Sequence, residues 1–398
     1  MDCIERFINY AKIDTQSDDR TGKTPSTEKQ KNLSLLLVKE LKELGLEDAY
    51  MDEYAVVYAH LKGEGTHIGF NSHVDTALEV TGKDVKPRII KNYDGGDIKL
   101  NDEYTLTQKQ FPIMKQHIGH DLVVTDGNTL LGADDKAGIA IIMSALEYLV
   151  NHPEIKHKNI CVAFTPDEEI GEGPLHFDIN KMQAEYAYTI DGSYIDAIDF
   201  ENFNAMQLHL HIDGVSVHPG EGKNALINAA VLMSEFISAL PQDETPYDAN
   251  EDEGFWHIND VQCSSEKGDL FMILRDFDEN KLNERVNQIN TIVENIQNKW
   301  PKATLKAEFK DQYENMRKYV EKDNRPVLLA DKILVKNGLT PKHSKIRGGT
   351  DGATFSKMGL VTPNLGTGSY NHHGRFEFLD IQEFKKMIDI VIDLMTIE

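Results

Sequence analysis

Three apolar runs typical of β-strands each lead directly into acidic or histidine side chains. The runs are HIGFNS (67–72), KNICVAF (158–164) and EYAYTI (185–190), and AGIAIIMSALEYLV from Ala137 is typical of a buried helix. Strands that alternate with helices predict a parallel or mixed sheet covered by helices, and loops at the carboxyl ends of its strands face one crevice. The sequence therefore predicts an α/β fold with a site at that edge of the sheet.

A different pattern occupies the middle of the chain. MQLHLHI from Met206 alternates like a strand, a helix is expected over 224–240, strand LFMILR over 270–275, a second helix over 282–296, and strand LKAEF over 305–309. This order of strand, helix, strands, helix and strand is that of a ferredoxin-like unit. Because 398 residues exceed the roughly 250 to 300 at which single cores stop growing, we expect two domains. The first would comprise residues 1–205 and 316–398, and the second, 206–315, would be inserted in it.

Composition disfavours several classes of function. The chain is 40% hydrophobic and 27% charged, without an apolar stretch near the ~20 residues that span a bilayer. Its net charge of −24 makes nucleic acid and anionic membranes poor partners, because phosphate binding depends on basic patches. Cys3, Cys161 and Cys263 lie far apart, which fits a reducing compartment and argues against a thiolate metal site. We expect a cytoplasmic protein whose metal ligands are His and carboxylate.

The first two polar motifs each allow a structural and a functional interpretation. In SHVDT (72–76), His73 and Asp75 are two residues apart, so both point the same way from an extended backbone. Such a pair could supply one imidazole ligand and the carboxylate that orients it. In GADDKAG (132–138), Asp134 and Asp135 stand at the start of a helix. N-capping explains one aspartate, and metal ligation is the alternative for the other.

The remaining motifs add carboxylates and imidazoles. TPDEEIGEG (165–173) follows an apolar strand, and its acids are either a solvated turn or a metal ligand, Glu169, beside a general base, Glu168, with a raised pKa. TIDG ends on Asp191, and NHHGRFEF (371–378) offers His372 and His373. Taken together, one group of residues predicts a site for two divalent ions, namely His73, Asp134, Glu169, Asp191 and His373.

In this order and at these separations, the motifs SHVDT, LLGADDKAG, TPDEEIG, IDG and YNHHGRFEF resemble those of the peptidase T family of tripeptide aminopeptidases, within the zinc aminoacylase and carboxypeptidase superfamily. The likeness covers essentially the whole chain, including the KPRIIKNYDGGDI (86–98) and IRGGTDGA (346–353) segments. It implies a zinc-peptidase catalytic domain with an inserted lid or dimerisation domain, two Zn²⁺ per chain with Co²⁺ or Mn²⁺ as alternatives, small peptides as substrates, and a homodimer through the inserted domain.

The resemblance also implies metal ligands. Asp134 would bridge both ions, His73 and Asp191 would complete the coordination of one, and Glu169 and His373 that of the other. Asp135 would then be structural. His372 stands where the family accepts an aromatic residue.

Further roles follow from the same resemblance. Asp75 would orient His73, and Glu168 would be the general base. In GVSVHPGEGKNA (214–225), His218 matches a histidine that stabilises the oxyanion, in dimers that of the partner subunit, although the residues alone show only a histidine in a Gly and Pro turn. Arg275 and Arg347 are candidates to bind a peptide carboxylate by bidentate pairing. A turn-stabilising role is the alternative for Arg347.

The expected activity is release of the N-terminal residue from tripeptides. A metal-activated water would give its proton to Glu168 and attack the peptide carbonyl. A dipeptidase or an N-acyl amino acid deacylase on the same dinuclear scaffold is the alternative, because it would share every ligand. A catalytically silent homologue should lack the base, and the chain has both Glu168 and Asp75.

Overall fold

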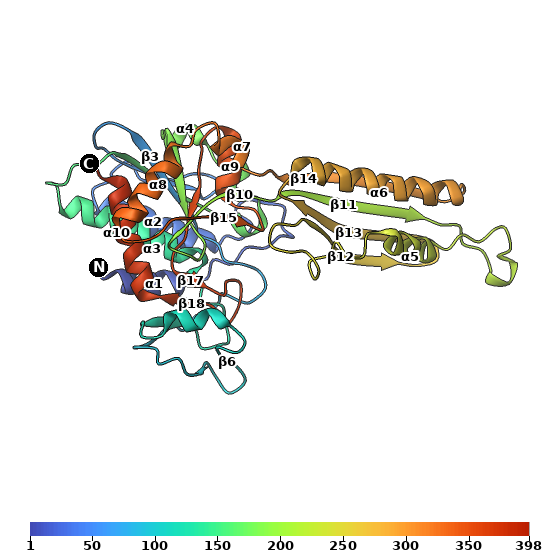
Figure 1. The fold of residues 1–398 in the computed structure, drawn as a ribbon, viewed down its shortest axis with the longest axis horizontal. Helices are drawn as coiled ribbons and strands as arrows, with labels where there is room; N and C mark the ends of the chain where they lie inside the picture. The colour runs from blue at the N-terminus through green and yellow to red at the C-terminus, as the bar shows by residue number, and fades with distance from the viewer. Residues whose placement is uncertain (398) are drawn as a thin grey trace. The chain divides into compact units, whose positions relative to one another are not determined.

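The computed structural model describes residues 1–397 and divides the chain into two compact units (Figure 1). The larger unit contains Met1–Phe200, Met316–Lys345 and the described residues from Thr350 onward. The inserted unit contains Glu201–Asn315 and Ile346–Gly349. The inserted unit begins five residues before the expected residue 206, and it also includes Ile346–Gly349. The first strand of the inserted unit's sheet begins at Asn204, and the Arg347 side chain binds the backbone of that unit.

An eight-stranded mixed sheet forms the centre of the larger unit, which confirms the predicted fold class. Its parallel part is β8 (Asn159–Thr165), β3 (His67–His73), β9 (Tyr186–Ile190) and β16 (Asn364–Leu365), and antiparallel neighbours flank it on both sides. The three predicted strands correspond to β3, β8 and β9. In spatial order the strands are β1 (Tyr50–Met51), β2 (Val57–Leu61), β8 (Asn159–Thr165), β3 (His67–His73), β9 (Tyr186–Ile190), β16 (Asn364–Leu365), β10 (Ala197–Asn202) and β15 (Lys342–Ile346).

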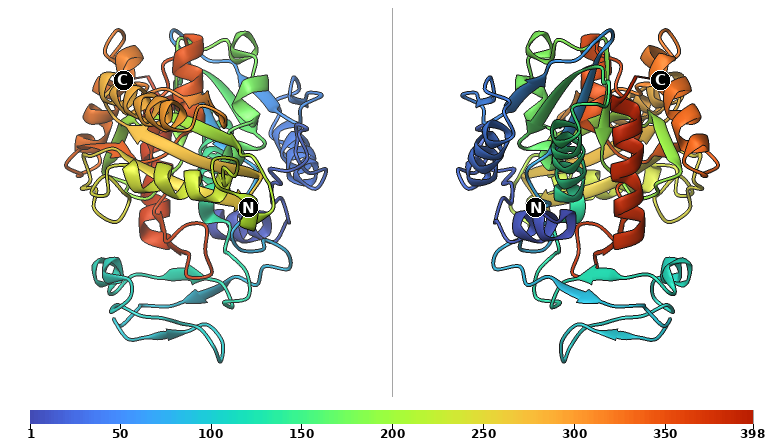
Figure 2. Two further views of the ribbon diagram at one scale, coloured as in Figure 1. Left: turned by 90° about the vertical axis from the view of Figure 1, so that its right-hand side faces the viewer. Right: turned by 90° about the vertical axis from the view of Figure 1, so that its left-hand side faces the viewer.

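Helices cover this sheet, and α3 (Ala133–Asn151) is the most deeply buried of them. It packs against β3, α1 (Cys3–Ala11) and α10 (Ile381–Met395), as Figure 2 also shows. A Cβ on Gly138 would lie 1.9 Å from the carbonyl oxygen of Ile190, so glycine lets α3 approach the sheet closely. Pro326 lies in the first turn of α8 (Arg325–Lys336). The other helices of this unit are α1 (Cys3–Ala11), α2 (Gln30–Glu43), α4 (Ile179–Met182), α7 (Arg317–Val320), α8 (Arg325–Lys336), α9 (Asp351–Met358) and α10 (Ile381–Met395).

The interval between His73 and Asp134, together with residues 369–380, forms a small subdomain that the sequence did not reveal. Its strands pair in the order β17 (Ser369–Tyr370), β18 (Phe378–Asp380), β7 (Leu122–Val124) and β4 (Arg88–Ile90), beside a hairpin of β5 (Ile98–Lys99) and β6 (Thr105–Leu106). Asp380 Oδ2 accepts from His117 Nδ1 at 2.8 Å and from His120 Nδ1 at 2.5 Å, while Oδ1 caps α10. Through its pairing with β7 and these contacts of Asp380, β18 joins the segment after His373 to this subdomain.

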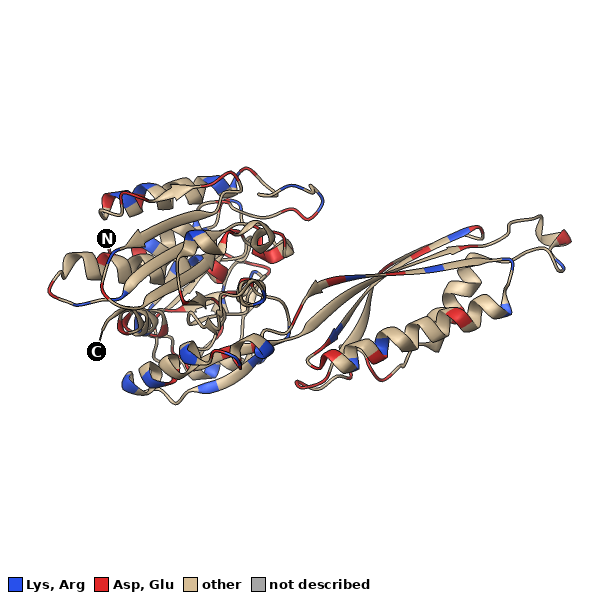
Figure 3. Ribbon diagram, turned by 90° about the horizontal axis from the view of Figure 1, so that it is seen from above, with Lys and Arg blue, Asp and Glu red and all other residues tan. Residues whose placement is uncertain are grey.

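The inserted unit has the predicted order of elements. Its antiparallel sheet runs β12 (Phe255–Cys263), β13 (Lys267–Asp276), β11 (Asn204–Asp213) and β14 (Thr304–Tyr313). Helices α5 (Ala229–Ala239) and α6 (Glu279–Lys299) pack on the face that carries Leu208, Leu210 and Ile212, and Figure 3 shows α6 along the sheet with acidic and basic residues along it. The helix expected from Asn224 begins only at Ala229, because Asn228 caps it by accepting from the amide of Ala230.

No helix in residues 1–397 has both the length and the apolar character needed to cross a membrane.

Candidate metal centre

Five predicted site residues meet at one edge of the larger unit's sheet. His73 is the last residue of β3, Asp191 follows β9, and Asp134 lies in the first turn of α3. Glu169 follows β8 in a 3-10 turn (Glu168–Ile170), and His373 follows β17. Because β3, β8 and β9 are parallel, their carboxyl ends bring these side chains to the same place.

These side chains form two groups that share Asp134. His73, Asp134 and Asp191 each offer a ligand atom, all within 4.8 Å of one another, and Asp134, Glu169 and His373 do the same. One oxygen of Asp134, Oδ1, lies 3.0 Å from His73 Nε2. The other, Oδ2, lies 3.3 Å from His373 Nε2, which is also 3.1 Å from Glu169 Oε2. A carboxylate with one oxygen in each group has the geometry of a bridging ligand.

The donor atoms fit divalent cations. They are imidazole nitrogens and carboxylate oxygens, the ligand types of catalytic zinc and related ions. Glu169 Oε1 is buried and has no hydrogen-bond partner among the described residues, which is costly unless a cation meets it. The three cysteines are all free and belong to neither group.

The electrostatics of the clustered carboxylates also indicate a cation site. Burial, opposed by His73 and reinforced by Asp191, raises the pKa of Glu168 well above its usual value. Burial and the charge of Asp134 raise the pKa of Glu169 to about 7 and that of Asp191 to about 6. Buried carboxylates that repel one another in this way are stabilised by positive charge.

Two adjacent histidines lie near Asp134, and their contacts differ. His372 Nδ1 is 3.4 Å from Asp134 Oδ2, but its Nε2 is bonded to Ser369 Oγ at 2.8 Å. His373 Nε2 faces Asp134 and Glu169 together, and His373 has a left-handed backbone with φ of 61°. Such conformations in non-glycine residues concentrate at functional sites. The geometry favours His373 over His372 as a ligand.

Asp75 makes more contacts than sequence reasoning assigned to it. Its Oδ1 lies 3.3 Å from His73 Nδ1, as a ring-orienting carboxylate should. The same oxygen accepts the backbone N–H of Glu168 at 3.0 Å, and Oδ2 accepts that of Glu169 at 3.2 Å. One buried carboxylate therefore holds both an imidazole and the turn that carries the two glutamates.

Asp135 points into the protein and binds backbone. Its Oδ2 accepts the amide of His73 at 3.2 Å and its Oδ1 accepts that of Gly138 at 3.3 Å. Burial, reinforced by the charge of Asp191, raises its pKa well above the usual value. These contacts fit the structural role that the resemblance implies.

Two further carboxylates support the cluster, and sequence reasoning missed both. Glu377 accepts the backbone amides of Leu131, Gly132 and Asp134 at 2.7, 2.8 and 3.0 Å, so it holds the loop that carries the shared aspartate. Asp167 accepts from the amide of Ser26 at 2.5 Å and from Gln30 Nε2 at 2.6 Å, which ties the glutamate turn to the first residue of α2 and to the segment before it. Both acids lie inside motifs already recognised, RFEF and TPDEE. Their hydrogen-bond partners are far away in the sequence, so the residues around each acid gave no signal of them.

Three predicted residues lie in the inserted unit. His218 is exposed and its Nδ1 accepts the amide of Gly220 at 3.2 Å. Arg275 is 9% exposed, donates to the carbonyl of Leu274 at 2.9 Å and lies over the Tyr313 ring.

Arg347 donates to the carbonyls of Asn250 and Glu251, each at 2.6 Å, and lies over the rings of Phe203 and Phe255. These contacts match the turn-stabilising alternative. Peptide binding by either arginine stays a prediction.

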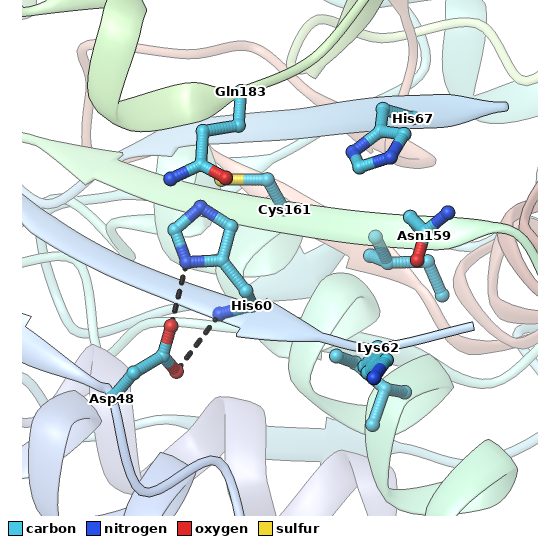
Figure 4. A pocket seen from close by; sticks show the side chains of 9 residues that line it. Asp48, His60, Lys62, His67, Asn159, Cys161 and Gln183 are labelled. Carbon is cyan, nitrogen blue, oxygen red and sulfur yellow. Dashed lines mark hydrogen bonds and ion pairs between the residues drawn. The ribbon is translucent and has the colours of Figure 1, made fainter. Parts of the chain in front are cut away.

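A separate cavity of about 230 Å³ lies near the amino ends of β3 and β8 (Figure 4). His60 Nδ1 bonds Asp48 Oδ2 at 2.7 Å and its Nε2 bonds the carbonyl of Lys181 at 2.9 Å. Asn159 likewise bonds the backbone of Gly63 and Gly65. Since these polar groups are satisfied within the protein, the cavity gives no indication of a ligand.

Comparisons with known proteins identify the family. The model of peptidase family M20/M25/M40 matches residues 120–396. Peptidase T of Clostridium perfringens (strain 13 / Type A) is 45% identical over 397 residues, 99% of this chain and 98% of that one.

Solved structures share the fold. A crystal structure of an aminopeptidase PepT from Bacillus cereus aligns with a TM-score of 0.76 and 21% identity over 99% of this chain and 97% of that one. A dinuclear metal binding peptidase of the M20 family from Bacillus subtilis aligns with a TM-score of 0.64 and 13% identity over 98% and 96% of the two chains. The family match and the whole-length identity together establish that this chain belongs to peptidase family M20/M25/M40 and, within it, to the peptidase T family.

Proposed function

We propose that the chain is a metal-dependent aminopeptidase that releases the N-terminal residue of tripeptides. The observation that carries this function is the sharing of Asp134 between two ligand groups, with the unshared Glu168 beside them. Membership of the peptidase T family supports the reaction class and the substrate. The deacylase or dipeptidase alternative would use the same ligands, and no observation favours it.

We infer that two divalent ions, zinc in the first place, occupy the centre. His73, Asp134 and Asp191 would hold one ion, and Asp134, Glu169 and His373 the other. The dinuclear metal content of the Bacillus subtilis structural neighbour supports this number. Bound there, such ions supply Lewis acidity, which polarises a peptide carbonyl and lowers the pKa of water. Three carboxylates against two divalent ions leave a small positive charge to do so.

Glu168 is the general base in this proposal. Glu168 belongs to neither ligand group, yet its Oε2 lies 4.0 Å from His73 Nε2, so its carboxylate lies beside the metal-ligand groups. Asp75 accepts the backbone N–H of Glu168 and so holds it in place. Burial raises the pKa of Glu168 towards the range in which a carboxylate can both accept and return a proton. A carboxylate oxygen of Glu168 accepts the proton of the attacking water and then delivers it to the nitrogen of the leaving amine.

His218 is proposed as the donor that stabilises the oxyanion. Because its Nδ1 accepts the Gly220 amide, the neutral ring carries its proton on Nε2 and can donate from there. The resemblance places such a histidine at the partner's site in a dimer, so we also propose a homodimer through the inserted unit. The cytoplasmic location stays a prediction.

A substrate panel tests the function. We expect tripeptides with free termini to be hydrolysed best, dipeptides and tetrapeptides less well, and peptides with an acetylated N-terminus very poorly. Chelation should abolish the activity, and Zn²⁺, Co²⁺ or Mn²⁺ should restore it. Preferential hydrolysis of dipeptides or N-acyl amino acids would overturn the tripeptidase assignment while leaving the metal centre intact.

A further inference from the structure

The inserted unit carries a second cluster of metal-ligand side chains that the proposed reaction does not use. In β11, Leu208, Leu210 and Ile212 face the helices, so the alternating His209 and His211 project from the opposite face of the sheet. The neighbouring strand β13 places Asp269 directly opposite His211. Side chains from two hydrogen-bonded strands thus meet at one point.

Three donor atoms converge there. His209 Nε2 and His211 Nδ1 each lie 2.8 Å from the same oxygen, Oδ1 of Asp269. The ligand atoms of all three residues lie within 4.8 Å of one another. The side chains are 34%, 29% and 38% exposed, so an ion could enter without unfolding of the sheet.

The surroundings of both imidazoles resemble those of metal-bound histidines. The second nitrogen of His211, Nε2, lies 3.2 Å from Asp213 Oδ1, and ligating histidines usually give their other ring N–H to a carboxylate or carbonyl. The ring of His209 stacks on Phe271 with centroids 4.4 Å apart and an angle of 7°, which fixes its direction. Each ring is therefore oriented by a contact other than Asp269.

The carboxylates around the two imidazoles would suit a bound cation. Asp269 and Asp213 bring two negative charges to imidazoles that are neutral in their ligating form. Lys306, opposite His211 on β14, forms an ion pair with Glu308. A divalent cation between the rings and Asp269 would balance the two carboxylates.

We propose that His209, His211 and Asp269 form an additional binding site for one divalent transition-metal ion in the inserted unit. Two imidazoles and one carboxylate favour Zn²⁺, Co²⁺, Ni²⁺ or Cu²⁺ over Ca²⁺ and Mg²⁺, which prefer oxygen ligands. The ion links β11 to β13, so it stabilises the folded unit against the unfolded chain by mass action.

Metal counting on the full chain tests this site. The protein is stripped with a chelator and dialysed against buffered free Zn²⁺, and bound zinc per chain is measured by plasma mass spectrometry. We expect wild type to hold one ion more than the His209→Gln, His211→Gln double variant, and the control His257→Gln, on β12 of the same sheet, to match wild type. Because the result is a difference in binding and does not involve hydrolysis, it is independent of the proposed function.

Two single variants guard against misfolding of the double variant. Asp269→Asn keeps the size of the side chain and should also lose the additional ion, with an unchanged circular dichroism spectrum. Asp213→Asn, which touches only the outer nitrogen of His211, should weaken binding of that one ion about 10- to 100-fold without abolishing it. Equal zinc content in wild type, the double variant and Asp269→Asn at saturating free Zn²⁺ would overturn the proposal.

Discussion

Asp75 and Glu168 are joined through the backbone, since Asp75 Oδ1 accepts the amide of Glu168 at 3.0 Å. The other oxygen of Asp75 accepts the amide of Glu169, and Oδ1 also faces His73 Nδ1. The positions of the proposed ligands His73 and Glu169 and of the proposed base Glu168 therefore depend on one buried carboxylate.

We expect Asp75→Asn to reduce both turnover and metal affinity. An amide has one oxygen and one NH₂ group, so it cannot accept from the two backbone amides and the imidazole together. Metal affinity should fall about 10- to 100-fold, as for other residues that orient ligands, with turnover falling as well. Metal titration of the apo protein and kcat at saturating metal measure the two effects. The control Asp102→Asn, at a side chain that is 97% exposed, should change neither. Unaltered metal affinity in Asp75→Asn would contradict the orienting role.

Glu377 should matter to the metal centre without contacting it. Glu377→Gln leaves an NH₂ group facing one of the amides of Leu131, Gly132 and Asp134. We expect a loss of about 1–3 kcal/mol in the free energy of unfolding, because a buried donor is left unpaired. Metal affinity should fall as well, since Asp134 moves with its loop. Denaturant unfolding and metal titration measure the two losses. The control Glu103→Gln, at an exposed side chain, should show neither, and a Glu377→Gln protein that behaves like this control would contradict the role of Glu377.

Asp380 predicts a pH dependence of stability. Burial alone would raise its pKa, but hydrogen bonds from His117, the Glu383 amide and His120 outweigh burial and lower it. A lowered folded pKa gives stability that is present above the unfolded value of about 3.9 and is lost as pH falls through the folded value.

Asp380→Asn keeps the helix cap but loses the charge. It should be less stable than wild type by about 1.5–3 kcal/mol near neutral pH. The difference should shrink below about pH 4. Urea unfolding of both proteins between pH 3 and pH 7 measures it, and a difference that is constant over this range would be inconsistent with the ion pair.

His218 provides a test of the dimer. His218→Ala should lower turnover much more than metal content, because a donor to the oxyanion acts mainly in the transition state and its loss costs about 2.7 to 4 kcal/mol. If His218 serves the partner's site, mixed dimers of inactive His218→Ala and inactive Glu168→Gln chains regain activity. Absence of recovery after proven subunit exchange would show that each chain completes its own site.

Local patterns predicted the elements that carry the site, and failed where contacts are long-range. Clear apolar patterns mark β3, β8, β9 and α3, and a polar motif follows each strand and opens the helix. These elements could therefore be predicted from the sequence. The strands of the 86–124 subdomain are two or three residues long, too short for any periodicity. The ion pairs of Asp380 with His117 and His120 span more than 250 residues and leave no local signal.

The same distinction holds for the site residues. The metal-ligand groups could be proposed because each residue sits in a motif, whereas the partners of Glu377 and Asp167 depend on the folded loops around them. Arg347 follows the inserted segment in sequence by some thirty residues, yet it packs on Phe203 and Phe255 of the inserted unit. Its sequence neighbours gave no sign of this.

Glu168→Gln tests the central claim most directly, because it changes one carboxylate oxygen beside the ligand groups and no ligand. Purified wild type and variant are compared for bound metal and for turnover of a tripeptide at saturating substrate. We predict equal metal content, about two ions per chain at the dinuclear centre, with kcat reduced by on the order of 10² to 10⁴ or more. Near-normal turnover in a folded, metal-loaded Glu168→Gln protein would contradict the assignment of Glu168 as the base.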